Sequence, residues 1–239
     1  MKIDILAIGA HPDDVELSCG GTLIKAVRQG RRVGIVDVTE GELGTRGSRE
    51  LRAVEAQNAA TAMGIHYRAN LRIPDGNIEK TLDNVLRLVT VIRAVRPDVL
   101  LIPHSVDRHP DHESSHQLCR KAWFDAGLRR IPSSLDGVAQ EPFRPRAVYH
   151  YMQWHEFTPS FIVDVSETYE RRVEAMRAYK SQFYDPNSDE PDTVLTSPAF
   201  LDMVRTRLEY YGDRIGVQYG EAFFSPVPLA IPDVFTLNT

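Results

Sequence analysis

Two short segments carry the side chains of this sequence that are best suited to chemistry. His11-Pro12-Asp13-Asp14 follows an apolar run over residues 3–8, and His109-Pro110-Asp111-His112 follows another over residues 99–102. Ionisable groups at the end of a buried strand are costly unless they are paired or bind an ion. Because two imidazoles and one carboxylate are a common ligand set for catalytic zinc, the two segments predict a metal site.

A carboxylate that does not bind the metal can accept a proton from a water molecule and so act as a base. Spacing alone leaves open which carboxylate is the ligand and which is the base. The alternative is that both segments are simple turns with solvated acids, since Pro and Asp favour turns. The repetition of the motif favours the metal site.

The pattern of apolar residues indicates how segments a hundred positions apart meet. Strands are predicted at residues 3–8, 33–38, 71–73, 99–102, 147–152 and 161–165, and helices at 17–28, 49–63, 82–95, 114–124, 167–183 (with Ser166 as N-cap) and 199–211. This alternation predicts an α/β fold, Rossmann-like and doubly wound, in which helices flank a mainly parallel sheet within a single domain, residues 1–239. In the usual order the first and fourth strands are neighbours, so the active site is expected in the crevice at their carboxyl ends.

Two competing interpretations use parts of the same sequence. His112-Glu113-Ser114-Ser115-His116 matches H-E-x-x-H, in which His112 and His116 would bind zinc in a peptidase with Glu113 as base. That interpretation leaves residues 11–14 unused. It also requires a helix that is already formed before His112, whereas Pro110 lies only two residues upstream. A nucleotide-binding module is disfavoured because GAHPDD, not G-x-G-x-x-G, follows the first strand. We therefore expect His116 to orient a neighbour or to pack.

The bulk composition sets limits on partners and compartment. The 239 residues are 42% hydrophobic and 26% charged with a net charge of −5, so nothing favours nucleic acid or an anionic membrane as partner. No apolar stretch is long enough to span a bilayer, and the N-terminus does not resemble a signal peptide. Cys19 and Cys119 are the only cysteines, which predicts a cytoplasmic protein without disulfides.

The chain resembles the LmbE-like (PIG-L) zinc-dependent N-acetylglucosamine deacetylases. The resemblance covers nearly the whole chain and rests on AHPDD, on HPDH a hundred residues later, on TEGELGTRG at 39–47 and on NLRIPDG at 70–76. The last two segments resemble the bacillithiol-biosynthesis branch, which removes acetate from N-acetylglucosaminyl-malate and leaves a free amine. Malate, inositol, a second sugar or a lipid as aglycone would leave the zinc centre unchanged.

The resemblance also implies roles for individual residues. It makes His11, Asp14 and His112 the ligands of one Zn²⁺ per subunit, although such a set also accepts iron or cobalt. It makes Asp13 the general base, and His109, in protonated form, the group that stabilises the oxyanion or protonates the leaving amine. Asp111 is then expected to orient an imidazole by hydrogen bonding.

Further candidates surround this centre. The resemblance suggests that Arg52 binds substrate hydroxyl or carboxylate groups, with Arg46 and Arg49 as rivals, and that Asp75 accepts sugar hydroxyls. Weaker candidates are Tyr219 and Glu221 in the C-terminal GVQYGEAFF segment, and Arg144 and Arg146 in the long polar loop 128–146, which is expected to cover the site or an interface. Relatives also suggest a homo-oligomer, with a hexamer as one such form. The predicted partner is a small amino-sugar substrate.

Overall fold

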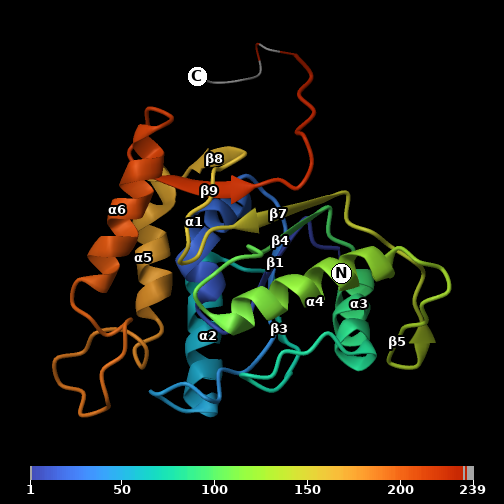
Figure 1. The fold of residues 1–239 in the computed structure, drawn as a ribbon, viewed down its shortest axis with the longest axis horizontal. Helices are drawn as coiled ribbons and strands as arrows, with labels where there is room; N and C mark the ends of the chain where they lie inside the picture. Colours follow the sequence, from blue (N-terminus) through green and yellow to red (C-terminus); the bar gives the residue numbers. More distant parts are fainter. Residues whose placement is uncertain (1, 234, 236–239) are drawn as a thin grey trace.

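The computed structural model describes residues 2–233 and 235. Its centre is a seven-stranded sheet (Figure 1), whose strands are β1 (Ile5–Gly9), β2 (Val33–Asp37), β3 (Tyr67–Asn70), β4 (Val99–Pro103), β7 (Ala147–Tyr151), β8 (Phe161–Asp164) and β9 (Gly220–Phe224). Their order is β3-β2-β1-β4-β7-β9-β8, and the first five are parallel. The antiparallel strands β9 and β8 complete one edge. The predicted mainly parallel fold and the pairing of β1 with β4 are confirmed.

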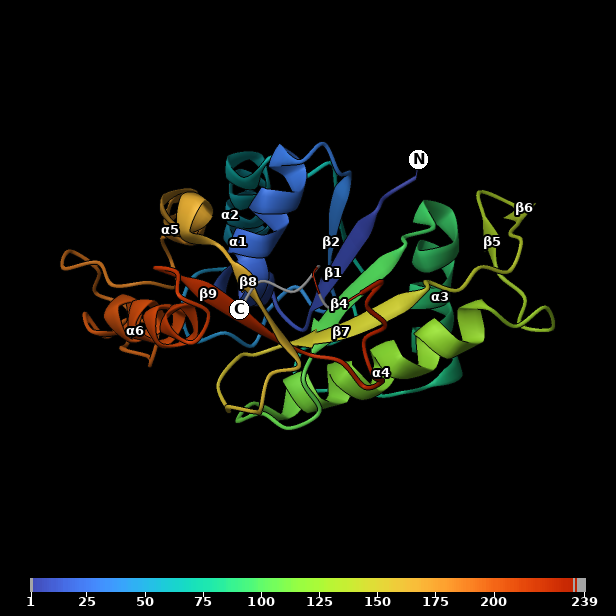
Figure 2. The same ribbon diagram turned by 90° about the horizontal axis from the view of Figure 1, so that it is seen from above.

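Helices cover both faces of this sheet, as expected for a doubly wound fold (Figure 2). They are α1 (Asp14–Arg28), α2 (Arg49–Met63), α3 (Leu82–Val95), α4 (Pro110–Ala126), α5 (Tyr169–Arg177) and α6 (Phe200–Asp213). One apolar core joins the sheet to α3 and α4, and the other joins the opposite face to α1, α2, α5 and α6. No helix in the described part of the chain is both long and apolar enough to span a membrane. Both cysteines are free and buried, as predicted.

Two helices begin earlier than predicted, and both differences concern the HPD motifs. Helix α1 starts at Asp14 rather than at residue 17, with Asp13 as N-cap in a left-handed conformation (φ 109°). Helix α4 starts at Pro110 rather than at residue 114, because a proline is well tolerated in the first helical position. The backbone N–H of Asp111 donates to Nδ1 of His109, which caps this helix. The motifs therefore occupy helix starts, where orphan N–H groups favour carboxylates.

Two other predicted elements are wrong in position, and one strand was not predicted. The third strand covers residues 67–70, and the predicted 71–73 lies after it. Ser166 does not cap a long helix but begins a 3-10 turn over residues 166–168, and its hydroxyl donates to the carboxylate of Asp164. Helix α5 follows this turn and ends at Arg177, not at residue 183. Strand β9 was not predicted, because its five residues begin with a glycine and show no clear period-two pattern.

The C-terminal strand has a structural role in helix α1. Helix α1 is kinked at Cys19 (φ −143°), which leaves backbone groups on both sides of the kink without helical partners. Glu221 accepts the N–H groups of Gly21 and Thr22, at 2.9 and 2.7 Å, and the guanidinium of Arg172 donates to the carbonyls of residues 16 and 17. Glu221 is thus a buried structural partner of Arg172 at 3.2 Å, and Tyr219 stacks on Tyr169. Neither lines the cavity described below, so the structure gives these two candidates structural contacts and no place in that site.

The loop 128–146 lies away from the carboxyl ends of the parallel strands. It contains a small hairpin, β5 (Ser134–Leu135) with β6 (Val138–Ala139), at the end of the molecule near α3 (Figure 2). Arg93 of α3 anchors the loop by donating to the carbonyl oxygens of residues 126, 128 and 131. Arg144 stacks over Phe124, and neither it nor Arg146 lines the cavity. The expectation that this loop covers the site is therefore wrong.

Candidate metal centre

Three predicted ligands from the two HPD motifs meet at the carboxyl ends of β1 and β4. One carboxylate oxygen of Asp14 lies 3.5 Å from Nδ1 of His11, and the other lies 3.2 Å from Nε2 of His112. One donor atom from each residue lies within 4.8 Å of the other two, which is close enough to hold a metal ion. A nitrogen–nitrogen–oxygen set of this kind suits Zn²⁺ and leaves room for a further ligand.

The far side of each imidazole is held by a carboxylate. Nδ1 of His112 lies 2.7 Å from Asp107, and Nε2 of His11 lies 3.0 Å from Asp75 and 3.4 Å from Asp111. Carboxylates in this position fix the ring orientation and tautomer of metal-binding histidines. The arrangement therefore fits a metal centre and places Asp75 behind His11, where it also accepts the N–H of Leu43.

The charges around the three residues also suit a cation. Burial alone would raise the pKa of Asp14, but the charge of His112 and the bonds to both histidines hold it well below its usual value. Burial alone would lower the pKa of His112, but Asp14 and Asp107 raise it to about 9. The pKa of His11 is also raised, because its hydrogen bonds with Asp111, Asp14 and Asp75 outweigh its burial. The same carboxylates that favour a proton on each imidazole would favour a metal cation, which would replace these protons on binding.

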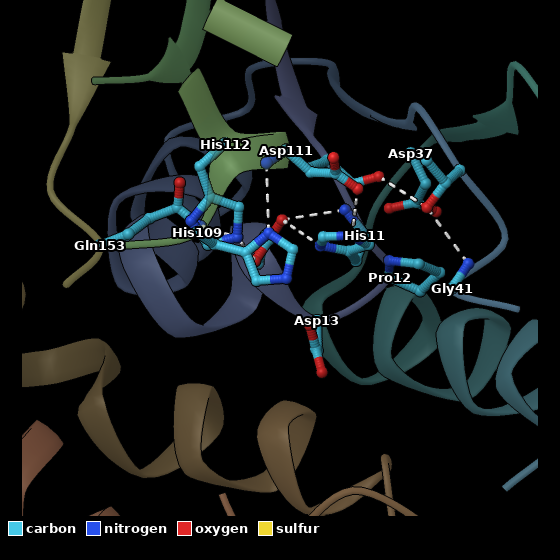
Figure 3. A network of polar contacts seen from close by, with 12 residues as sticks. His11, Pro12, Asp13, Asp37, Gly41, His109, Asp111, His112 and Gln153 are labelled. Atoms are coloured by element: carbon cyan, nitrogen blue, oxygen red, sulfur yellow. Dashed lines mark hydrogen bonds and ion pairs between the residues drawn. The ribbon is translucent and has the colours of Figure 1, made fainter. Parts of the chain in front are cut away.

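His109 lies against the same cluster but makes different contacts. Its ring packs edge-on to His11, with centroids 4.9 Å apart, and stacks on His112 at 5.0 Å. Burial lowers the pKa of His109, and the nearby charges of His11 and His112 lower it further. A second donor group, His11 with His109 and Asp111, is also compact enough for a metal. Figure 3 shows these rings gathered with Asp111.

Asp13 lies below this cluster, and its carboxylate points away from the imidazoles (Figure 3). It is 3.2 Å from the guanidinium of Arg52, which also donates to the carbonyl of Pro12 and, at 3.2 Å, to Gln182. Burial raises the pKa of Asp13 to about 7 although Arg52 opposes the shift. Arg52 lines the cavity, but its terminal nitrogens are engaged by Asp13, Pro12 and Gln182, and its expected role in binding substrate stays a prediction.

These residues line a cavity of about 420 Å³, a size typical of small-ligand sites. The metal cluster and Asp13 form one side of the cavity. Apolar side chains from α1, α6 and the segment before α6 form much of the opposite side: Leu17, Leu195, Phe200 and Val204. Arg46 and Arg49 do not line it, because Arg46 bonds Ser188 and Arg49 pairs with Glu40.

Several cavity residues were not anticipated from the sequence. Asp107 lies two positions before His109, and its other oxygen accepts the N–H of Trp154 at 2.8 Å. The side-chain amide of Gln153 donates to Asp14 at 2.9 Å and lies 3.3 Å from Nε2 of His112. Asp107 could have been identified from the sequence as an acid close to a histidine motif. No sequence pattern pointed to Gln153.

The structure disfavours the zinc-peptidase interpretation. Nδ1 of His116 lies 2.9 Å from the carbonyl oxygen of Pro103, and its ring packs edge-on against His150. Within the described residues, His116 belongs to neither compact donor group. Glu113 accepts the N–H of Asp107, so it supports the turn before α4.

Comparison with known proteins gives a consistent picture. The chain is 31% identical over 229 residues to a diacetylchitobiose deacetylase of Thermococcus kodakarensis, covering 91% of this chain and 80% of the relative. It is 29% identical to a 1D-myo-inositol 2-acetamido-2-deoxy-alpha-D-glucopyranoside deacetylase of Thermobispora bispora, over 75% of this chain and 65% of the relative. The crystal structure of the conserved protein TT1542 from Thermus thermophilus superposes with a TM-score of 0.86 at 36% identity, covering 96% of this chain and 97% of that chain.

Residues 6–123, which contain both HPD motifs, match the family described as PIG-L, GlcNAc-PI de-N-acetylase. The similarity to the diacetylchitobiose deacetylase, over 91% of this chain, extends this relationship beyond residues 6–123. The chain therefore belongs to the PIG-L family of deacetylases.

Proposed function

We propose that this protein is a zinc-dependent N-deacetylase of a small N-acetylglucosamine conjugate. The observation that carries the proposal is that the compact donor group of His11, Asp14 and His112 lines the same cavity as Asp13. The pKa of the Asp13 carboxyl group, about 7, suits proton transfer at neutral pH. The deacetylases to which the chain is similar act on acetamido sugars according to their names.

The three ligand residues would hold the ion, with Asp107, Asp75 and Asp111 orienting the two imidazoles. A bound Zn²⁺ would supply Lewis-acid polarisation and lower the pKa of a water molecule. Asp13 accepts the proton of the attacking water in this proposal and passes it to the nitrogen of the departing amine. Arg52 holds the Asp13 carboxylate on the cavity wall and limits how far burial raises its pKa.

His109 is assigned the donor role at the acetamide oxygen. Because Nδ1 of His109 accepts the N–H of Asp111, a neutral ring carries its proton on Nε2. The lowered pKa of His109 favours this neutral form. Donation from Nε2 would stabilise negative charge on the carbonyl oxygen without an imidazolium, which refines the protonated form expected from the sequence.

For the substrate, we propose N-acetylglucosaminyl-malate, as in bacillithiol biosynthesis, on the strength of the TEGELGTRG and NLRIPDG segments. The alternative is an uncharged sugar conjugate, which the similarity to a diacetylchitobiose deacetylase favours. The two free, buried cysteines support a cytoplasmic enzyme. A homo-oligomer remains part of the proposal by family resemblance.

Acetate release from N-acetylglucosaminyl-malate, N,N′-diacetylchitobiose and N-acetylglucosamine tests the function, with bound zinc measured in every sample. Asp13→Asn is expected to keep its metal and to lose at least about 100-fold in kcat, the usual effect of removing a general base. Wild-type protein that binds zinc but releases acetate from none of these sugars would refute the proposed function.

A further inference from the structure

Arg207 on helix α6 lines the cavity but forms no direct ion pair with any residue that the structure describes. It lines the cavity together with Phe200 and Val204, from which it is separated by seven and three positions, so all three lie on one face of the helix. The buried stripe of α6 otherwise consists of apolar or aromatic residues and a glycine: Phe200, Val204, Leu208, Tyr211 and Gly212. An arginine at the edge of such a stripe is unexpected from packing alone.

The other arginine in the middle of this helix is paired. Arg205, two positions away, is 3.2 Å from Asp202 and 3.6 Å from Glu209 on the exposed side of the helix. Arg207 makes no hydrogen bond or ion pair with any residue that the structure describes, although its side chain is partly buried. Placing a guanidinium out of water without a partner is unfavourable, so the position suits a charge that a ligand completes.

The acids nearest to Arg207 do not supply that partner. Glu156 and Asp107 attract it only through space, since neither forms an ion pair with Arg207 in the described part of the chain. The Asp107 oxygens accept bonds from His112 and Trp154 instead. Arg172 lies close enough to repel it. Burial lowers the pKa of Arg207, in agreement with a guanidinium that has lost water without gaining a carboxylate.

Arg207 also fills a role that Arg52 does not. Arg52 was the cation expected to bind substrate carboxylates, but it is engaged by Asp13, Pro12 and Gln182. We propose that Arg207 binds a carboxylate on the aglycone of the substrate while the acetamide lies at the metal cluster. This inference rests on the proposed deacetylase function and adds to it a residue that determines specificity. A guanidinium suits a carboxylate because its two N–H groups bind both oxygens.

The test compares a substrate with carboxylates and a substrate without charge in the zinc-loaded protein. We measure kcat and KM for N-acetylglucosaminyl-malate and for N,N′-diacetylchitobiose in wild type, Arg207→Gln, Arg207→Lys and the control Arg205→Gln. The ratio of the two kcat/KM values, malate over chitobiose, is expected to fall about 10- to 100-fold in Arg207→Gln, mainly through KM. Arg207→Lys should give an intermediate ratio, because lysine keeps the positive charge but lacks the paired N–H donors of the guanidinium. The control Arg205→Gln should keep the wild-type ratio.

An unchanged ratio in Arg207→Gln would overturn the inference while leaving the deacetylase function intact. An equal loss on both substrates would also overturn it, because it would mark Arg207 as structural. Calorimetric binding of L-malate gives a readout that does not depend on turnover. If wild type hydrolyses neither sugar, the proposed function fails, and malate binding that is weakened in Arg207→Gln and kept in Arg205→Gln would still support the carboxylate site. Equal malate binding by all three proteins would overturn it.

Discussion

Asp107 offers the sharpest test of how the metal centre is built, since the sequence motif does not contain it. One of its oxygens lies 2.7 Å from Nδ1 of His112, and the other accepts the N–H of Trp154 at 2.8 Å. Burial alone would raise its pKa, but these hydrogen bonds lower it to about 2, so the group is a carboxylate at neutral pH. Asp107→Asn replaces one acceptor with an NH₂ donor. Either His112 or Trp154 then faces a donor instead of an acceptor.

The expected loss follows from that mismatch. Replacing a carboxylate behind a metal-binding histidine typically weakens metal affinity about 10- to 100-fold, equivalent to about 1.4–2.7 kcal/mol. Zinc affinity is measured by competition with a chromophoric chelator at pH 7.5, with circular dichroism to establish that the variant is folded. Asp83→Asn is the control, because Asp83 forms only an exposed pair with Arg87. Wild-type affinity in folded Asp107→Asn would refute the assignment of His112 as a metal ligand oriented by Asp107.

Three further predictions concern pH and stability. The pKa of His112 is raised to about 9 and that of His11 is also raised, so zinc binding at pH 7 should release up to about two protons. Calorimetry in buffers of different ionisation enthalpy would detect this release, and zinc binding without proton release would contradict the prediction. Burial lowers the pKa of His150 from 6.5 to about 3, so between these pH values the unfolded chain binds a proton that the folded protein does not, and stability falls as the pH drops through this window. Urea unfolding should show a loss from this group of at most about 1.4 kcal/mol per pH unit, so the pH dependence should be less steep in His150→Leu than in wild type. Glu221→Gln should cost about 3–5 kcal/mol in unfolding free energy, since it leaves the buried Arg172 unpaired, whereas Glu174→Gln in an exposed pair should cost under about 1 kcal/mol.

The sequence was informative where chemistry and topology depend on local patterns. The apolar runs before the two HPD motifs identified parallel strands, and the usual strand order predicted that β1 and β4 are neighbours, so His11, Asp14 and His112 were expected together. The start of α1 was not predicted, because Asp13 adopts a positive φ, which is uncommon for a residue other than glycine. Strand β9 was missed because it depends on pairing with β7 and β8 rather than on its own five residues.

The opposite wall of the cavity could not be predicted, because its position depends on packing between distant segments. Helix α6 contacts β9 and β8, and β9 carries Glu221, which completes the kinked helix α1 through Gly21 and Thr22. The kink at Cys19 lies five residues beyond Asp14 in the same helix. The buried ion pair of Arg172 and Glu221 therefore connects the helix that carries Asp14 to the strand on which α6, with Arg207, packs. The place of the proposed metal ligands at strand ends follows from the fold class, whereas the place of Arg207, proposed to select the aglycone, follows from this packing. The deacetylation chemistry of the family can therefore stay constant while the substrate changes with α6 and β9.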